Sequence, residues 1–218
     1  MRLSFFVRRY MRLRHKPHAI PKMQESDYII FEAKDYKGNW QEIFKNDNEI
    51  ELEIGAGKGD FIVNKAEKNP NVNYLALEMN TNAFVSACEK IEEEELSNVY
   101  GIVGKAEELL DMFEDGEISK IYLNFSTPWP KKRHNKRRLS HENFLKLYEK
   151  ICKAGSELEL KTDNEEFFDA SILYMEDFGM EILEVDRDLA EENSIVTEYE
   201  RKFRDKDMPI FYLKARFN

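Results

Sequence analysis

Short apolar segments alternate with amphipathic segments along most of the chain. Residues 49–55, 73–79, 98–104, 119–125 and 156–162 have the length and composition typical of strands. Between the last two lies SHENFLKLYEKICK, in which Phe144, Leu147, Tyr148 and Ile151 recur at helical spacing. This pattern predicts a helix with Ser140 as its N-cap. Strands and helices that alternate in this way predict a parallel sheet covered on both faces.

The C-terminal part of the chain has a different pattern. Segments 179–189 and 208–217 both have strand character, and no long helical pattern separates them. A loop connection between them requires at least one strand to run antiparallel. We therefore expect an α/β fold with a Rossmann-like, mostly parallel, doubly wound sheet and an antiparallel C-terminal strand. Because 42% of the 218 residues are hydrophobic and no linker interrupts them, residues 23–218 are predicted to form a single domain.

The net charge of -10 is distributed unevenly along the chain. Residues 1–22 contain seven Lys or Arg and residues 131–138 contain six, with no acid in either segment. The rest of the chain therefore has 20 basic and all 43 acidic residues. A basic patch on an acidic body can bind a polyanion at one place while the remaining surface repels it. A solvated loop and a disordered tail would give the same composition. Residues 1–22 are predicted to form a basic N-terminal arm, disordered or ordered by RNA.

Other sequence features narrow the class of protein. No apolar run is long enough for a membrane span and the first ten residues lack a secretory pattern, so we expect a cytoplasmic protein with no membrane partner. Cys88 and Cys152 lie far apart without a C-x-x-C motif, which predicts two core cysteines. The four histidines lack ligand spacing, so no metal is expected. The sequence leaves a monomer and a homodimer as open alternatives.

A glycine-rich turn follows the first of the central predicted strands. Gly55, Gly57 and Gly59 permit a tight turn and a close approach of the backbone to a ligand. Glu78 ends the next strand, where a carboxylate can accept hydrogen bonds from both ribose hydroxyls. Together these residues predict a cofactor that contains adenosine, the alternative being a tight turn with an exposed Glu. Asp60 stands where the dinucleotide fingerprint needs glycine, and an acid there opposes a pyrophosphate. S-adenosylmethionine has no phosphate and carries cationic groups, so the acidic loop favours a methyl donor.

Five further motifs occur in order along the chain: RLRHKP (12–17), EIGAGKG (53–59), YLNFSTPWPKKRHNKRRL (122–139), KTDN (161–164) and TEYERKF (197–203). The sequence thereby resembles the bacterial tRNA (guanine-N7-)-methyltransferase family from about Met11 to its end. The PWPKKRH and TEYE motifs are specific to that family, whereas many methyltransferases share the glycine loop. The resemblance implies a class I methyltransferase fold, S-adenosylmethionine as cofactor, tRNA as partner, and methylation of N7 of a guanine in the tRNA variable loop.

The resemblance also implies roles for particular residues. The expected donor-binding residues are Glu53, Gly55, Gly57, Gly59, Glu78, Lys105, Ala106, Asn124 and Thr127. The expected RNA-binding residues are Lys131, Lys132, Arg133, Lys136, Arg137, Arg138, Asp163, Thr197, Glu198, Tyr199 and Glu200. A guanine in a loop exposes edges that carboxylates such as Asp163 could recognise. Asp163 could equally be a helix N-cap, and Trp129 could either stack on a base or anchor the packing of its turn.

Three positions depart from the family's usual motifs. Thr127 stands where the family has an aspartate regarded as catalytic, Lys105 stands at a second family aspartate near the adenine end of the donor, and His18 replaces a tryptophan. Guanine N7 has an in-plane lone pair and needs no deprotonation, so the enzyme must mainly align the reacting atoms. Removing a charge of this kind commonly costs about 3 to 4 kcal/mol. We therefore expect Thr127, as the catalytic position, to give a slow enzyme rather than an inactive one. Met11 could be the true start of the chain.

Two other functions compete with methyl transfer. A tRNA-binding protein that kept the scaffold and lost its chemistry would explain Lys105 and Thr127. A nicotinamide-dependent oxidoreductase would use the glycine loop but has no use for the PWPKKRH motif.

Overall fold

The computed structural model describes residues 15–218 of the chain. The predicted basic arm falls partly outside this range: residues 1–14, with the alternative start at Met11, lie outside the described residues. The part that is described belongs to the domain, because helix α1 (Ala19–Gln24) packs on α4 (Thr81–Glu94) and buries two of its apolar side chains. The expected boundary between residues 22 and 23 therefore falls inside a packed helix.

Strands and helices alternate along the described residues as predicted. The strands are β1 (Ile29–Ile30), β2 (Ile50–Ile54), β3 (Asn73–Glu78), β4 (Val99–Val103), β5 (Ile118–Asn124), β6 (Cys152–Thr162), β7 (Glu181–Asp186) and β8 (Phe211–Arg216). The other α-helices are α2 (Gln41–Phe44), α3 (Asp60–Lys68), α5 (Leu109–Met112), α6 (Glu142–Ile151), α7 (Glu165–Phe178) and α8 (Glu198–Arg204). Short 3-10 helices are η1 (Ala33–Tyr36), η2 (Ala106–Glu108), η3 (Lys132–Arg137) and η4 (Glu191–Asn193). Across residues 15–218, every helix is too short or too polar to form a membrane span.

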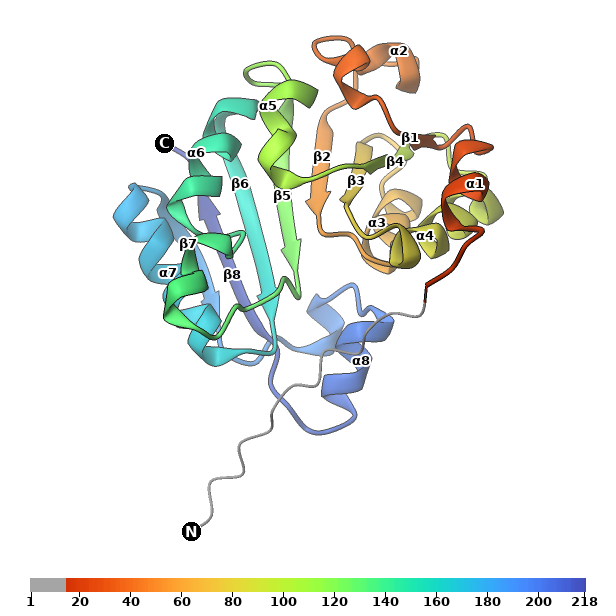
Figure 1. The fold of residues 1–218 in the computed structure, drawn as a ribbon. Helices are drawn as coiled ribbons and strands as arrows, with labels where there is room; N and C mark the ends of the chain where they lie inside the picture. Colours follow the sequence, from red (N-terminus) through yellow and green to blue (C-terminus); the bar gives the residue numbers. More distant parts are fainter. Residues whose placement is uncertain (1–14) are drawn as a thin grey trace.

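The strands form one sheet in the order β1-β4-β3-β2-β5-β6-β8-β7 (Figure 1). Neighbouring strands from β1 to β6 run parallel, whereas β8 runs antiparallel to both β6 and β7. This arrangement confirms the predicted doubly wound α/β sheet with an antiparallel C-terminal strand. The strand order reverses between β2 and β5, and ligands of such sheets bind at the carboxyl ends beside this point.

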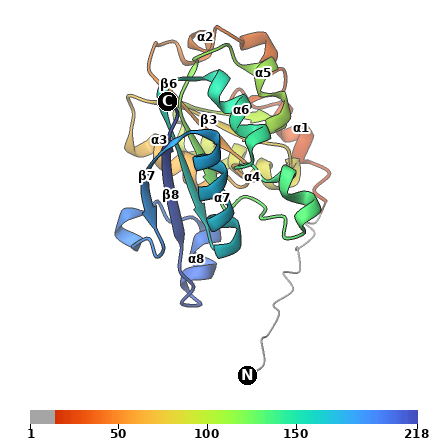
Figure 2. The same ribbon diagram turned by 90° about the vertical axis from the view of Figure 1, so that its left-hand side faces the viewer.

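Two apolar cores cover opposite faces of the sheet. One contains side chains of α5, α6 and α7, and the other contains side chains of α1, α3 and α4. Figure 2 shows α3 and α7 on opposite sides of the strands. Because central strands are buried on both faces, their sequences are nearly continuous apolar runs, as in residues 74–77 of β3. Cys88 and Cys152 are free and buried, one in each core, as predicted.

The N-cap of α6 differs from the prediction by one residue. His141 caps the helix, and its Nδ1 accepts a hydrogen bond from the backbone N–H of Asn143 at 3.2 Å. The Ser140 hydroxyl instead forms a hydrogen bond with the Ser171 hydroxyl at 2.7 Å, inside the protein. Ser140 therefore joins α6 to α7, which helical periodicity alone could not indicate.

Two other elements differ from the prediction. β6 begins at Cys152, upstream of the predicted start, and its first part pairs irregularly with β5 around Gly155, whose φ is +76°. The connection between β7 and β8 contains the short polar helix α8, where the sequence predicted only a loop.

Candidate functional site

The candidate site lies at the carboxyl ends of the central strands. Figure 1 shows α8 beyond the arrowheads of β2, β5 and β6, so the segment between β7 and β8 reaches the same edge of the sheet. The glycine loop follows β2, the PWPKKRH turn follows β5 and the KTDN motif spans the end of β6. The parallel sheet therefore brings motifs that are distant in sequence to one edge.

The glycine loop has the conformation that its sequence predicts. Gly55, Gly57 and Gly59 have φ values of +83°, +58° and +78°, a region that residues with side chains disfavour. A Cβ atom at Gly59 would lie 2.7 Å from the Cβ atom of Ala87, so α4 packs there only against glycine. At Gly55 the same position is open space, and a ligand can approach the backbone.

Glu53 is a buried carboxylate beside this loop. It is 2% exposed, and Asn124 Nδ2 donates a hydrogen bond to its Oε1 at 2.8 Å. Its Oε2 is buried and has no hydrogen-bond partner among the described residues. Burial raises the pKa of Glu53 to about 7; Asn124 and Lys161 oppose this shift and Glu78 adds to it. A cationic ligand that entered the site could donate to this unpaired, buried acceptor.

Glu78 ends β3 on the other side of the glycine loop. Its Oε2 accepts a hydrogen bond from the Gly57 backbone N–H at 3.0 Å, and its Oε1 accepts one from the Asn80 N–H at 2.7 Å. Burial raises the pKa of Glu78, while these backbone donors lower it. The loop and the carboxylate are thus held to each other, in a place where the carboxylate can meet ribose hydroxyls.

Lys105 and Ala106 follow the next strand, β4. The Lys105 side chain is exposed and lies 3.9 Å from Glu108 Oε1, so it points to solvent and pairs along its own helical turn. Ala106 is buried and begins η2. Only the backbone of this pair is therefore placed to contact a donor.

Thr127 lies in a turn with unusual backbone geometry. Phe125 before it and Trp129 after it have φ values of +51° and +43°, which cost free energy for residues with large side chains. Arg138 holds the turn, because its Nε donates to the Pro128 carbonyl at 2.8 Å. Thr127 itself is half-buried. Strained residues of this kind occur at functional sites, where surrounding contacts maintain them.

The Trp129 side chain is partly exposed, so it is no core anchor. Its ring contacts His134 edge-on at 5.6 Å, and the Arg137 guanidinium lies 5.1 Å from its centroid. The ring thereby organises the basic run that follows it.

The basic run divides into an exposed and a buried part. Five cations are exposed on or beside η3, and none of them forms an ion pair with another described residue: Lys131, Lys132, Arg133, Lys136 and Arg137. Arg138 is 3% exposed and donates to the backbone carbonyls of Pro128 and Trp129. The prediction that Arg138 binds RNA directly does not fit this position, and its role is to hold the turn.

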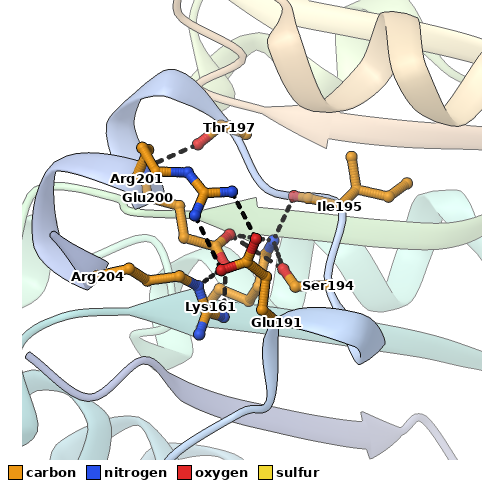
Figure 3. Close-up of polar contacts among 8 residues, drawn as sticks. All are labelled: Lys161, Glu191, Ser194, Ile195, Thr197, Glu200, Arg201 and Arg204. Carbon is orange, nitrogen blue, oxygen red and sulfur yellow. Dashed lines mark hydrogen bonds and ion pairs between the residues drawn. The ribbon is translucent and has the colours of Figure 1, made fainter. Parts of the chain in front are cut away.

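The TEYE segment also divides in two. Thr197 is the N-cap of α8, and its hydroxyl accepts from the Glu200 backbone N–H at 3.0 Å. Glu200 is 0% exposed and pairs with Lys161 and Arg204 (Figure 3). The predicted direct RNA contacts of the Thr197 and Glu200 side chains do not fit this burial. Glu198 and Tyr199 are exposed, as contact residues must be.

The exposed Glu198 fastens α8 to the glycine loop. Its carboxylate accepts from Lys58 Nζ at 2.7 Å, and its backbone N–H donates to Asp60 Oδ2 at 3.0 Å. Asp60 also pairs with Lys90 of α4. The acid next to the glycine loop thus has a cationic partner within the protein.

Asp163 lies one residue before the N-cap of α7. The cap is Asn164, whose Oδ1 accepts from the Phe167 backbone N–H at 2.8 Å. Asp163 is therefore not the cap, and it is half-buried at the carboxyl end of β6. Two residues earlier lies Lys161, a buried residue of the site that the sequence did not indicate. A lysine directly after Leu160, near the end of a strand with apolar residues at alternate positions, was the available signal.

The strand order, the glycine turn after β2 and the carboxylates that end β2 and β3 are those of a class I methyltransferase. Residues 47–213 match the family described as "Putative methyltransferase". More specifically, the chain belongs to the tRNA (guanine-N(7)-)-methyltransferase family. It is 46% identical to the member from Oceanobacillus iheyensis over 95% of this chain and 99% of that protein, and 44% identical to the member from Listeria innocua over 95% and 99%.

Solved structures support the fold. The 16S rRNA methyltransferase KamB matches with a TM-score of 0.65 at 14% identity, over 83% of this chain and 93% of that one. A 16S rRNA (adenine(1408)-N(1))-methyltransferase from Catenulisporales acidiphilia, solved with SAM, matches with a TM-score of 0.60 at 13% identity, over 83% and 90%. These likenesses establish the class I fold independently of the sequence motifs.

The described residues fit S-adenosylmethionine, the cofactor of this class. The unpaired Oε2 of Glu53 can accept from the donor's ammonium, and the open space at Gly55 leaves room for the chain that carries it. Glu78 can accept from the ribose hydroxyls, and the Ala106 backbone can meet the adenine. When bound, the cofactor supplies a methyl group on a cationic sulfur.

Proposed function

We propose that this protein transfers the methyl group of S-adenosylmethionine to N7 of a guanine in the variable loop of tRNA. One observation carries the proposal: the turn after β5 joins Asn124, which contacts the buried acid Glu53, to five exposed cations, all within 13 residues of Asn124. A polyanionic substrate held by these cations would lie next to the donor. Family membership supports tRNA as that polyanion.

The cations would bind phosphates, and the strained turn would set the position of the base. Lys131, Lys132 and Arg133 begin the exposed run directly after the turn. Phosphate contacts fix the register of a nucleic acid without reading its sequence. Asp163 and Glu198 lie at the same edge, where a carboxylate can accept from the guanine N1–H and N2–H groups; Glu198 would do so while also accepting from Lys58 and Lys202.

Methyl transfer to N7 makes modest demands on the protein. The bound donor would supply its methyl group to the N7 lone pair and leave as a neutral thioether, so the positive charge would pass to the purine and no protein group would have to remove a proton first. The residues must hold N7, the methyl carbon and sulfur in line and exclude water. Thr127 can accept a hydrogen bond in the turn but contributes no negative charge. We therefore expect slow turnover relative to a site with a carboxylate there.

The test is methyl transfer from labelled S-adenosylmethionine to an unmodified tRNA transcript, with the methylated base mapped. Label at N7 of the variable-loop guanine supports the proposal. A transcript with adenosine at that position is the control and should stay unlabelled. Label elsewhere in the tRNA would refute the stated specificity.

A second function is favoured by Thr127, which lacks the family carboxylate: a tRNA-binding protein without methyl transfer. It predicts tRNA binding with no label in the product. Calorimetric titration with S-adenosylhomocysteine separates the cases further, because a pure tRNA-binding protein has no need to bind it.

A further inference from the structure

Lys161 occupies an unusual position for a lysine. It lies near the end of β6, 4% exposed, in the sheet beneath α8. Burial of an ammonium is unfavourable unless hydrogen bonds and opposite charges compensate. Burial lowers the pKa of Lys161, and Glu200 foremost, then Glu53 and Glu159, raise it. The contacts and strand pairing of Lys161 connect it to three parts of the site: the segment that contains α8, the turn that contains Thr127, and Glu53.

The first contact is with residues 194–200, which lead into α8 and contain the proposed RNA-binding residues Glu198 and Tyr199. Lys161 Nζ donates to Ser194 Oγ at 2.9 Å, to the Ile195 carbonyl at 3.1 Å and to Glu200 Oε2 at 2.9 Å (Figure 3). All three ammonium hydrogens are used. Glu200 in turn accepts two hydrogen bonds from Arg204, at 2.9 and 2.6 Å. One side chain thereby fixes both the approach to α8 and the helix that displays Glu198 and Tyr199.

The second contact is with the turn that carries Thr127. The Lys161 carbonyl accepts from the Phe125 backbone N–H at 2.8 Å, where the chain enters its left-handed conformation. The Lys161 ammonium lies 6.0 Å from the centroid of the Phe125 ring. That ring also packs against Tyr199 at 5.3 Å and Phe203 at 6.1 Å. The turn and α8 therefore meet above Lys161.

The third connection is with the donor acid. Lys161 pairs with Asn124 in the register of β5 and β6, and Asn124 donates to Glu53. Glu53, Asn124 and Lys161 thus follow one another across β2, β5 and β6 on one face of the sheet. The positive charge of Lys161 lowers the pKa of Glu53, against the larger effect of burial and the repulsion from Glu78.

We propose that Lys161 is a positioning residue that couples the two binding sites: it holds residues 194–200 and the Thr127 turn on one side, and on the other it lies beside Asn124, which contacts Glu53. The proposal rests on the proposed function for the identity of the two ligands. It predicts that losing the charge weakens tRNA binding and changes the pH dependence of donor binding together.

The test compares Lys161→Met with a matched control, Lys120→Met. Lys120 lies on the same face of β5, and its Nζ pairs with Glu159 at 2.6 Å and Glu157 at 3.2 Å, away from α8. Each variant is titrated with S-adenosylhomocysteine across a pH series and with a tRNA transcript at one pH. Neither readout requires turnover, so a slow enzyme does not obscure the result.

In the wild type, binding of S-adenosylhomocysteine should strengthen as the pH rises through the pKa of Glu53. In Lys161→Met this rise should move to higher pH, because the charge that lowers the pKa of Glu53 is gone. The Kd for tRNA should increase about tenfold, within the range by which residues that contact neither ligand alter coupling. Lys120→Met should lose stability without either change.

A purely structural role would give a different outcome. If Lys161→Met melts at a lower temperature but keeps the wild-type pH profile and tRNA affinity, the proposal is wrong. If this variant does not fold, Lys161→Gln is measured instead, since its amide can still donate to Ser194 and Ile195 and it carries no charge. Failure of the wild type to bind S-adenosylhomocysteine would contradict the proposed function itself, which is a separate result from an unchanged profile in the variants.

Discussion

Replacing Glu53 with glutamine should make the stability of the protein less dependent on pH. Burial raises the pKa of this carboxyl from its ordinary 4.5 to about 7. The folded protein therefore holds the proton more tightly than the unfolded chain does, and stability falls as the pH rises between these two values. Above the folded pKa the loss from this group is complete. Glutamine has no proton to lose and avoids this penalty.

The magnitude follows from the two pKa values. Linkage between an unfolded pKa of 4.5 and a folded pKa of about 7 gives a change of about 2.5 kcal/mol between pH 5 and pH 8.5. Over that range, the unfolding free energy of Glu53→Gln should rise by this amount relative to the wild type. Any constant cost of burying the amide cancels, because the same variant is compared at two pH values.

The assay is urea denaturation of both proteins without ligand at the two pH values. Glu67→Gln, which changes an exposed carboxylate of α3, is the control for the chemical substitution. A relative gain near zero would show that burial does not hold the proton on Glu53. Glu53→Gln should also bind S-adenosylhomocysteine more weakly at pH 8.5, because it offers no carboxylate to the ligand's ammonium. Undiminished binding would contradict the role assigned to Glu53.

Three other substitutions test the turn and the basic run. Thr127→Asp should raise the rate of methyl transfer, by up to about 10²-fold, because a carboxylate stabilises the charge that develops on the purine. Alanine at residues 131–133 should weaken tRNA binding and flatten the dependence of log Kd on log salt by about two units, because up to three phosphate contacts are lost. Arg138→Met should destabilise the protein by roughly 3 kcal/mol, because the turn loses its buried hydrogen bonds. Rate measurement, salt-dependent binding and urea denaturation check these three outcomes.

The basic run needs a control of equal charge. Alanine at Lys34, Lys45 and Lys153 removes three cations far from the turn in sequence and should leave the salt dependence unchanged; Lys45 precedes β2 and Lys153 lies at the start of β6. Equal flattening by both triple variants would mean that general charge, rather than this run, attracts tRNA. For the turn, unchanged or lower turnover of Thr127→Asp would show that the missing carboxylate does not limit the rate.

The fold was predictable because its central strands are buried on both faces. Continuous apolar runs such as residues 74–77 leave few alternatives to a parallel sheet strand. The glycine loop and Glu78 were also predictable. Each stands at the carboxyl end of a predicted strand, and parallel strands place these ends at one edge of the sheet. The helix between the last two strands was harder to predict. α8 is short and polar, and its stability comes from Thr197 and Glu200 rather than from an apolar face.

Charged residues in the motifs could not be divided by sequence into surface and interior. Arg137 and Arg138 are neighbours, yet one is exposed and the other is buried against backbone carbonyls. Glu198 and Glu200 differ in the same way. Residues two or one positions apart in a helical turn point in different directions, and only the packing of the turn on the rest of the protein decides which one is covered.

The connection between β7 and β8 has an evolutionary consequence. β7 and β8 pair directly, and the Leu189 N–H donates to the Ile210 carbonyl at 2.8 Å, which closes the base of the intervening segment. The segment 190–209 therefore leaves and re-enters the sheet at neighbouring points of one hairpin. Its length and sequence can change while the hairpin is kept, provided that partners for Lys161, Lys58 and Asp60 remain. Under the proposed function, exchanging this segment is accordingly a route to enzymes that recognise other RNAs.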